Sequence, residues 1–308
     1  MSPRQGADLL PAERPIDHNV PMTAKSQTRW TGDPGVLLRV GEGFRLADVD
    51  PDTTPGFTGG KKQGQADLDA GAAELDDLQE RLFAQSRVEE NAPAVLLVLQ
   101  AMDSAGKGGI VRHVIGSVDP QGVHLAAFKA PTAQERAHDF LWRIEKQLPQ
   151  PGYIGVFDRS HYEDVLIGRV RALASAEEID RRYGAIVDFE KRVTDAGTRI
   201  VKVMLHISPE EQKARLMERL DRPDKYWKYN PGDVDERKLW PAYMEAYQTV
   251  FDRTSTPDAP WYVVPADAKW YARLAVQALL LDALEDIDPQ WPPADFDVAV
   301  EKKRLAAT

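Results

Sequence analysis

Residues 94–109, AVLLVLQAMDSAGKGG, consist of an apolar run of strand length followed at once by a glycine-rich turn. The run 94–99 suits a strand that is covered on both faces, as at the centre of a parallel sheet. The turn leads into residues 110–114, which can begin a helix, and backbone N–H groups at such a place form a cradle for phosphate oxygens. A plain flexible turn is the alternative. The strand–turn–helix order favours a phosphate-binding loop, with Lys107 as its mobile positive charge and Ala105, Gly106, Gly108 and Gly109 around the phosphate.

This loop departs from the standard phosphate-loop pattern G-x-x-x-x-G-K-[ST] at two positions. Ala101 stands where the first glycine is expected, and Gly108 replaces the hydroxyl residue that normally binds magnesium. A magnesium ligand must therefore come from another side chain, and Asp103 lies inside the loop. A loop aspartate often only forms a turn or faces water. Because Asp103 sits between the strand and the turn, we predict that it binds Mg²⁺ and acts in catalysis.

A second candidate site begins at the end of another predicted strand, in residues 155–164, GVFDRSHYED. Ligands gather at the carboxyl ends of strands in open parallel sheets, so Asp158 is expected to face the same crevice as the phosphate loop. There Asp158 would bind magnesium or orient its water, and Arg159 would neutralise the oxygens of a transferring phosphate. The alternative is a helix-capping acid beside a surface arginine. Three further residues of this stretch could contact a nucleotide: His161, Glu163 and Asp164. Alternatively, each of them only starts a helix or forms an ion pair.

Residues 213–228 form a third candidate site, with six basic and three acidic residues and thus a local charge of +3. The stretch 224–233 mixes cations with aromatic residues and breaks the helical pattern, as expected of a lid over a crevice. Arginine and lysine suit a polyanionic phosphate, whereas interleaved aromatics could stack on single-stranded nucleic acid. A solvated helix face is the third alternative. A continuous helix would place Arg215, Arg219 and Arg222 on one face. The predicted phosphate contacts are these three arginines together with Lys225 and Lys228.

The chain around these sites alternates predicted strands with predicted helices. Such alternation indicates βαβ units and an α/β fold of three layers, with a central parallel sheet and helices on both faces. An extended arm at 1–64 precedes these elements, and a charged, proline-rich tail at 288–308 follows them. Besides 94–99, the predicted strands are 122–128, 153–157, 199–207 and 261–264, and the predicted helices are 67–86, 109–117, 133–147, 177–196, 208–219, 238–252 and 267–285.

The composition narrows the class of protein. Of the 308 residues, 43% are hydrophobic and 29% charged, so the chain can bury a sizeable core. Forty-nine acidic against 39 basic residues give a net charge of −10, which argues against broad binding to nucleic acids or anionic membranes. We see no secretory signal and no apolar stretch of about 18 residues. The cysteine count of 0 excludes disulfides and thiolate chemistry and fits a reducing compartment, so we predict a soluble, cytoplasmic protein.

Four motifs in this order resemble the polyphosphate kinase 2 family, over about residues 35 to 285. The resemblance implies a P-loop kinase-like domain at 65–287, with a helical lid at about 213–240. It implies reversible transfer of the terminal phosphate of inorganic polyphosphate to AMP or ADP, with Mg²⁺. It also implies adenine or guanine nucleotides as partners and a homodimer or homotetramer. The motifs are LQAMDSAGKGG (99–109), FKAPTAQERAHDFLW (128–142), GVFDRSHYEDVL (155–166) and ERLDRPDKYWKYNPGDVDERKLWPAY (218–243).

The resemblance also assigns roles to the residues named above. Asp103 and Lys107 belong to the phosphate loop, and Asp158 and Arg159 form the second acid and base. The residues implied to lie on or near the lid that holds the phosphate chain are Arg215, Arg219, Arg222, Lys225 and Lys228. Residues 160–164, SHYED, resemble the subgroup that accepts both nucleoside mono- and diphosphates. Lys129 is a further candidate for contact with the acceptor nucleotide.

Two other functions are alternatives that fit the same sequence features. An ATP-dependent nucleoside monophosphate kinase would need the same loop and the same lid arginines. A non-catalytic nucleotide- or polyphosphate-binding module would have no use for two separated acids at strand ends, Asp103 and Asp158.

Overall fold

The structure of the chain is a computed structural model and describes residues 29–308. Its centre is a five-stranded sheet in which every neighbouring pair of strands is parallel and the strand order is β2-β3-β1-β4-β5. This architecture confirms the predicted α/β fold with a central parallel sheet. The strands are β1 (Ala94–Ala101), β2 (Val123–Ala127), β3 (Ile154–Asp158), β4 (Thr198–His206) and β5 (Trp261–Pro265).

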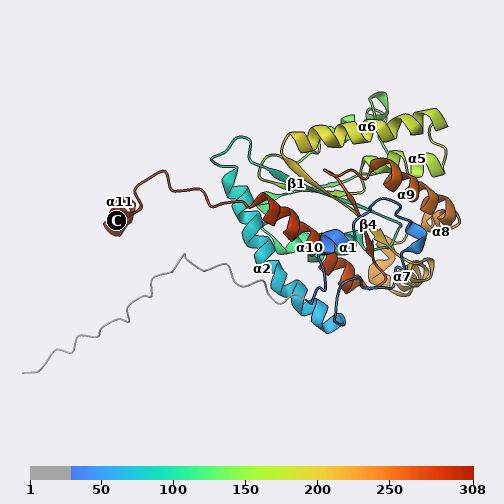
Figure 1. Ribbon diagram of the computed structural model, residues 1–308, viewed down its shortest axis with the longest axis horizontal. Helices are drawn as coiled ribbons and strands as arrows, with labels where there is room; N and C mark the ends of the chain where they lie inside the picture. The colour runs from blue at the N-terminus through green and yellow to red at the C-terminus, as the bar shows by residue number, and fades with distance from the viewer. Residues whose placement is uncertain (1–28) are drawn as a thin grey trace, which may run out of the picture.

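Helices cover both faces of this sheet, as Figure 1 shows. One face carries α2 (Lys61–Gln85) and α10 (Lys269–Ile287), which pack against each other, with α1 (Pro34–Leu37) and α3 (Lys107–His113) beside α10. The other face carries α6 (Ala176–Asp195) and α9 (Trp240–Thr254), with α5 (Ile167–Val170) between them. The predicted three layers are therefore present. The remaining helices are α4 (Trp142–Glu145), α7 (Pro209–Asp221), α8 (Gly232–Arg237) and α11 (Val298–Ala306).

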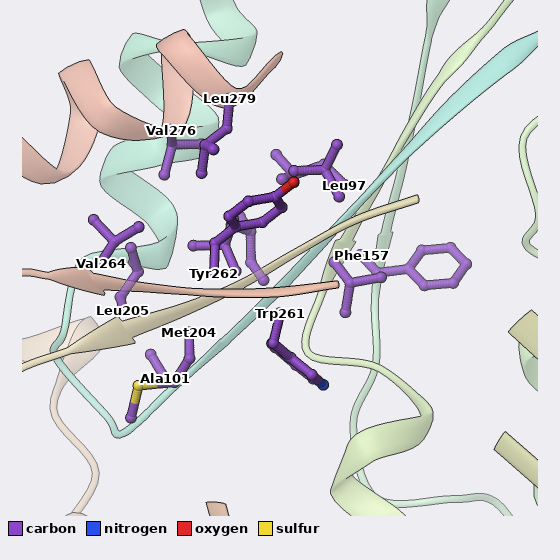
Figure 2. Packing of buried hydrophobic residues seen from close by; sticks show 14 of the residues in the cluster. Leu97, Ala101, Phe157, Met204, Leu205, Trp261, Tyr262, Val264, Val276 and Leu279 are labelled. Atoms are coloured by element: carbon purple, nitrogen blue, oxygen red, sulfur yellow. The ribbon is translucent and has the colours of Figure 1, made fainter. Parts of the chain in front are cut away.

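The core fills both interfaces between sheet and helices. All eight residues of β1 are buried, which explains why its sequence is continuously apolar rather than alternating. In β5 the neighbours Trp261 and Tyr262 point to opposite faces, and Tyr262 lies on the side of Val276 and Leu279 of α10 (Figure 2). The edge strand β2 has only one buried residue, Ala126.

Two predicted helices differ from the observed ones. The stretch 133–147 contains a single turn of 3₁₀ helix at Glu135–Ala137 and the short α4. The side chains of Glu135 and Thr132 accept from each other's backbone N–H groups, at 2.6 and 3.2 Å, and this capping box starts the turn. The turn ends because the backbone is extended at His138, after which Asp139 Oδ1 accepts from Leu141 N–H at 3.0 Å ahead of α4. Helix α2 begins at Lys61, six residues earlier than predicted, and the tail contains α11.

Part of the predicted N-terminal arm, residues 1–28, lies outside the described residues. Within the described part of the arm, residues 38–40 lie along the outer edge of the sheet, where Val40 N–H bonds the Trp261 carbonyl at 2.8 Å and Val263 N–H bonds the Leu38 carbonyl at 2.9 Å. The arm thus pairs with the exposed edge of β5, which would otherwise be free to pair with another chain. None of the helices within 29–308 is both long and apolar enough to cross a membrane.

Candidate active site

The phosphate loop connects the end of β1 to the start of α3. Gly106 has a backbone φ of 128°, which a residue with a Cβ atom adopts only with strain. Lys107 folds back so that its Nζ donates to the Ala101 carbonyl at 3.1 Å. Burial and the nearby Arg159 lower the pKa of Lys107, against the opposing effect of the acidic residues Asp103 and Asp158. The lysine therefore lies in the electrostatic field of both predicted catalytic acids.

Asp103 and Asp158 reach the crevice from neighbouring strands. β1 and β3 pair so that Leu99 lies beside Asp158, and Asp103 follows Leu99 after four residues. Arg159 donates from Nη2 to Asp103 Oδ1 at 2.8 Å. Its backbone φ of 65° is sparsely populated by non-glycine residues. The four predicted catalytic residues, Lys107 included, thus lie together at the carboxyl ends of β1 and β3.

A basic cavity of about 560 Å³ opens above the phosphate loop. It is lined by the predicted residues Ala105, Gly106, Gly108, Gly109, Lys129, Arg215, Arg219, Lys225 and Lys228, with the four catalytic candidates. Sequence reasoning missed four further basic residues in its lining, Arg112, His113, Lys269 and Arg273. A signal for them exists in the chain. Arg112 and His113 lie on α3, one turn beyond the phosphate loop. Lys269 and Arg273 lie four residues apart in α10, which begins shortly after the carboxyl end of β5.

A second cavity of about 230 Å³, here called the tyrosine cavity, also has Asp103 and Arg159 in its lining. Burial raises the pKa of the Glu163 carboxyl in its wall, although Arg159 and Lys107 act in the opposite direction. Asp103 and Arg159 line both cavities. The other residues of the tyrosine cavity are Ala101, Met102, Leu166, Ile167, Asn230, Gly232, Asp233, Glu236, Tyr243 and Tyr247.

Arg215, predicted to bind phosphate, lines the basic cavity but is only 5% exposed, and most of its hydrogen bonds go to backbone carbonyls. Its guanidinium donates to the carbonyls of Ser104 (3.1 Å) and Ala105 (2.8 Å) in the loop. It also donates to Ala266 (2.7 Å) and Asp267 (2.9 Å) after β5. Its hydrogen bonds therefore fix the loop against β5 rather than leaving the guanidinium free for a ligand.

Arg222 does not share the face of Arg219, contrary to the prediction from helical spacing. Helix α7 ends at Asp221, and Arg222 has an extended backbone because a residue before a proline, here Pro223, disfavours the helical conformation. Its guanidinium bonds Asp224 at 3.0 Å and Glu218 at 3.3 Å. Arg222 lies outside the lining of both cavities.

The structure does not bring His161 or Asp164 into either cavity. His161 is 1% exposed, and its Nε2 lies 3.2 Å from Glu190 Oε1 in the core. Asp164 lies between two arginines, 3.4 Å from Arg143 and 3.5 Å from Arg182. Of the residues predicted for nucleotide contact, Lys129 lines the basic cavity and Glu163 lines the tyrosine cavity.

Comparison with known proteins agrees with this geometry. The model of the family "Polyphosphate kinase 2 (PPK2)" matches residues 61–292, which is more than half of the chain and includes every site residue discussed above. The chain belongs to the polyphosphate kinase 2 family. The family predicted from the four motifs is therefore confirmed, and the chain is a polyphosphate-dependent phosphotransferase.

Individual members of the polyphosphate kinase 2 family are similar over most of this chain. An AMP/ADP-polyphosphate phosphotransferase of Meiothermus ruber is 45% identical, over 81% of this chain and 91% of its own. An ADP-polyphosphate phosphotransferase of Rhodopseudomonas palustris is 41% identical, over 83% and 91%. The crystal structure of polyphosphate kinase 2 from Arthrobacter aurescens TC1 is 59% identical and superposes with a TM-score of 0.88, over 91% of this chain and 98% of that one.

The residues of this polyphosphate kinase 2 fit a magnesium ion bound in part by substrate. Within residues 29–308 no group of three or more His, Asp or Glu side chains forms a protein cage for a metal. Mg²⁺ at phosphate-transfer sites usually takes one or two carboxylates and completes its shell with phosphate oxygens and water. Asp103 and Asp158, which line the same cavity, match that donor set.

Proposed function

We propose that this polyphosphate kinase 2 transfers the terminal phosphate of inorganic polyphosphate to AMP and to ADP, reversibly. The observation that carries this proposal is the sharing of Asp103 and Arg159 by two cavities of different character. A polyphosphate chain in the basic cavity and a nucleotide in the tyrosine cavity would meet end to end at these two side chains. The names of the relatives from M. ruber and R. palustris, which specify AMP or ADP as acceptors, support adenine nucleotides.

The charge of the basic cavity supports polyphosphate as the donor. Within residues 29–308, Lys107, Arg112, Lys228 and Arg273 form no ion pair with a carboxylate, so their charges are free to meet an anion. Burial lowers the pKa of Arg273, and the neighbouring Arg112 and Arg215 lower it further. Crowded cations of this kind are relieved by a polyanion. We propose that residues 213–240 act as the lid that brings Arg219, Lys225 and Lys228 onto the chain.

The tyrosine cavity suits a nucleotide. Tyr243 and Tyr247 offer flat apolar faces, and Met102, Leu166 and Ile167 extend that surface. Glu163, Asn230 and Asp233 supply hydrogen-bonding groups that could contact the base or ribose. A stacked base at this place would direct its phosphates toward Asp103 and Arg159.

Phosphoryl transfer at this junction requires positioning and charge stabilisation more than covalent chemistry. Lys107 and Arg159 would share the negative charge on the oxygens of the transferring phosphoryl group. Asp103 and Asp158 would hold Mg²⁺, which when bound neutralises phosphate charge and orders the phosphate oxygens. The acceptor phosphate is already anionic near neutral pH, so no side chain has to deprotonate it.

Two variants test the assignment of the cavities. Arg273→Ala alters a residue that lines the basic cavity but not the tyrosine cavity, and Glu163→Gln alters a residue that lines the tyrosine cavity but not the basic cavity. We expect Arg273→Ala to raise the KM for polyphosphate and leave the KM for AMP near its original value. Glu163→Gln should change the KM for AMP or ADP and leave that for polyphosphate. If both variants change the same KM, the two-cavity assignment is wrong.

We further propose that the enzyme is a cytoplasmic homodimer or homotetramer. The absence of cysteine in a 308-residue chain supports a reducing compartment. Exposed apolar side chains in the C-terminal segment, which extends away from the body in Figure 1, support contacts with another copy; they are Trp291, Phe296, Val298 and Leu305. Light scattering of the purified chain measures the oligomeric state, and a monomer at micromolar concentration would contradict it.

A further inference from the structure

A buried ion-pair cluster lies beneath the segment that carries Asp158 and Arg159. Its centre is Lys202 of β4, whose side chain is 0% exposed. Lys202 Nζ donates to Glu190 Oε2 at 2.5 Å, to the Tyr162 hydroxyl at 3.0 Å and to the Thr254 carbonyl at 2.8 Å. A lysine ammonium has three N–H donors, so every one of them has a partner.

Two side chains of the active-site segment end in this cluster. The Tyr162 hydroxyl donates to Glu190 Oε1 at 2.7 Å, and His161 Nε2 lies 3.2 Å from the same oxygen. Glu190, at 1% exposure, therefore binds Lys202 through one oxygen and the segment through the other. Residues 161 and 162 are thus tied to α6 and β4 by charged hydrogen bonds, which are stronger than neutral ones.

The same segment directs other side chains toward the active site. Asp158, Arg159 and Glu163 line the two cavities, while His161 and Tyr162 between them point into the core. A second tie comes from Gln100, with its amide turned so that the nitrogen donates to Glu163 Oε1 (2.9 Å) and the oxygen accepts from Ser160 N–H (3.1 Å). The main chain from 158 to 164 is therefore held at several points.

Stability alone does not explain a lysine and a glutamate at these positions. Removing two charges from water is costly, and apolar residues of similar volume often serve a core as well or better. The neighbouring Arg159 has a backbone φ of 65°, a conformation that persists only where the surrounding structure enforces it. A directional cluster directly under this residue meets that requirement, whereas apolar packing would leave the segment more freedom.

We propose that Lys202 and Glu190 are positioning residues for phosphoryl transfer, because their hydrogen bonds to His161 and Tyr162 fix the place of Asp158, Arg159 and Glu163. This proposal rests on the roles proposed above for those three residues. Small displacements of groups that act on a transferring phosphoryl group cost much of the rate. Loss of the cluster should therefore lower kcat more than it changes the KM for polyphosphate, because most of the cations that line the basic cavity lie outside the segment 158–164.

The test is the double variant Lys202→Met with Glu190→Leu, which removes both charges together and leaves neither uncompensated. With polyphosphate and AMP, we expect kcat per folded molecule to fall about tenfold or more, while the KM for polyphosphate changes less than about threefold. Leu82→Ala is the control, since Leu82 is buried in α2, away from the segment. It should lower the thermal midpoint and keep kcat.

A second variant keeps the proposal testable if the double variant does not fold. Tyr162→Phe retains both charges and removes only the hydroxyl that Lys202 and Glu190 bind, and it should lower kcat several-fold at an unchanged KM for polyphosphate. A wild-type kcat in the folded double variant, or in Tyr162→Phe when the double variant is unfolded, overturns the proposal. Wild-type enzyme is assayed in parallel with polyphosphate and AMP. An inactive wild type would refute the proposed function, whereas an active wild type with equally active variants would refute only the positioning role of Lys202 and Glu190.

Discussion

Arg159 and Asp103 join two segments of the active site across 56 positions of sequence, through the 2.8 Å hydrogen bond between Nη2 and Oδ1. Both side chains are partly exposed, at 39% and 28%, so the pair adds little to the stability of the fold. Its importance is geometric, because it closes the phosphate loop onto the end of β3. When substrates bind, Arg159 would exchange this contact for phosphate oxygens, and Asp103 would exchange it for Mg²⁺.

Asp103→Asn and Asp158→Asn should each abolish turnover and leave the fold intact. Each change keeps the size of the side chain and removes the negative charge that would hold Mg²⁺. Initial rates at saturating polyphosphate and AMP, with circular dichroism of the same samples, make the comparison. Near-normal rates at saturating magnesium would show that these carboxylates are not the metal ligands.

Lys228→Ala should raise the KM for polyphosphate about tenfold, equivalent to about 1.4 kcal/mol of binding, because Lys228 lines the basic cavity and pairs with no carboxylate in the described part of the chain. The effect should shrink as salt increases, since salt screens the interaction. Arg222→Ala is the matched control, because Arg222 binds Glu218 and Asp224 outside the cavity. Equal effects of the two variants would mean that the lid binds the chain in another arrangement.

Arg215→Met should lower the free energy of unfolding by about 2–4 kcal/mol, since it leaves several buried carbonyls without donors. It should also lower kcat, because Arg215 holds the carbonyls of Ser104 and Ala105 in the phosphate loop. Urea unfolding and steady-state kinetics measure the two effects. A stable variant with a raised KM for polyphosphate alone would instead make Arg215 a direct ligand of the donor.

Acid should remove a stabilising contribution at the start of α6. Hydrogen bonds from Arg181 and Arg182 lower the pKa of Glu178 from its ordinary 4.5 to about 2. A carboxyl with a lowered pKa stabilises the folded state above its ordinary pKa, and the contribution is lost as the pH falls toward 2. The thermal midpoint of wild type should therefore exceed that of Glu178→Gln at pH 6, and the difference should shrink between pH 4.5 and 2. A constant difference would contradict this assignment.

The sequence predicted those parts of the site that depend on local pattern. The apolar run of β1 and the glycine turn after it are adjacent in the chain, so their geometry follows from neighbours alone. Asp158 was found for the same reason, since it ends a recognisable strand. These elements determine the parallel sheet and the place of the four catalytic candidates.

The remaining assignments depended on contacts between distant segments. Arg215 and Arg219 look equivalent in sequence, yet Arg215 is buried because the carbonyls of Ala266 and Asp267 lie within its reach. Lys269 and Arg273 contribute to the basic cavity because α10 lies beside α3. His161 follows a strand end, but its ring turns into the core toward Glu190. The burial of Arg215 and of His161 is not visible in the spacing of residues along the chain.

The most direct test of the central claim is a comparison of phosphate donors. Purified wild-type enzyme with Mg²⁺ is incubated with AMP or ADP, and with either polyphosphate or ATP, and the nucleotide products are separated by anion exchange. We expect ADP and ATP from AMP, and ATP from ADP, with polyphosphate as the donor. Phosphorylation of AMP by ATP, with no product from polyphosphate, would contradict it.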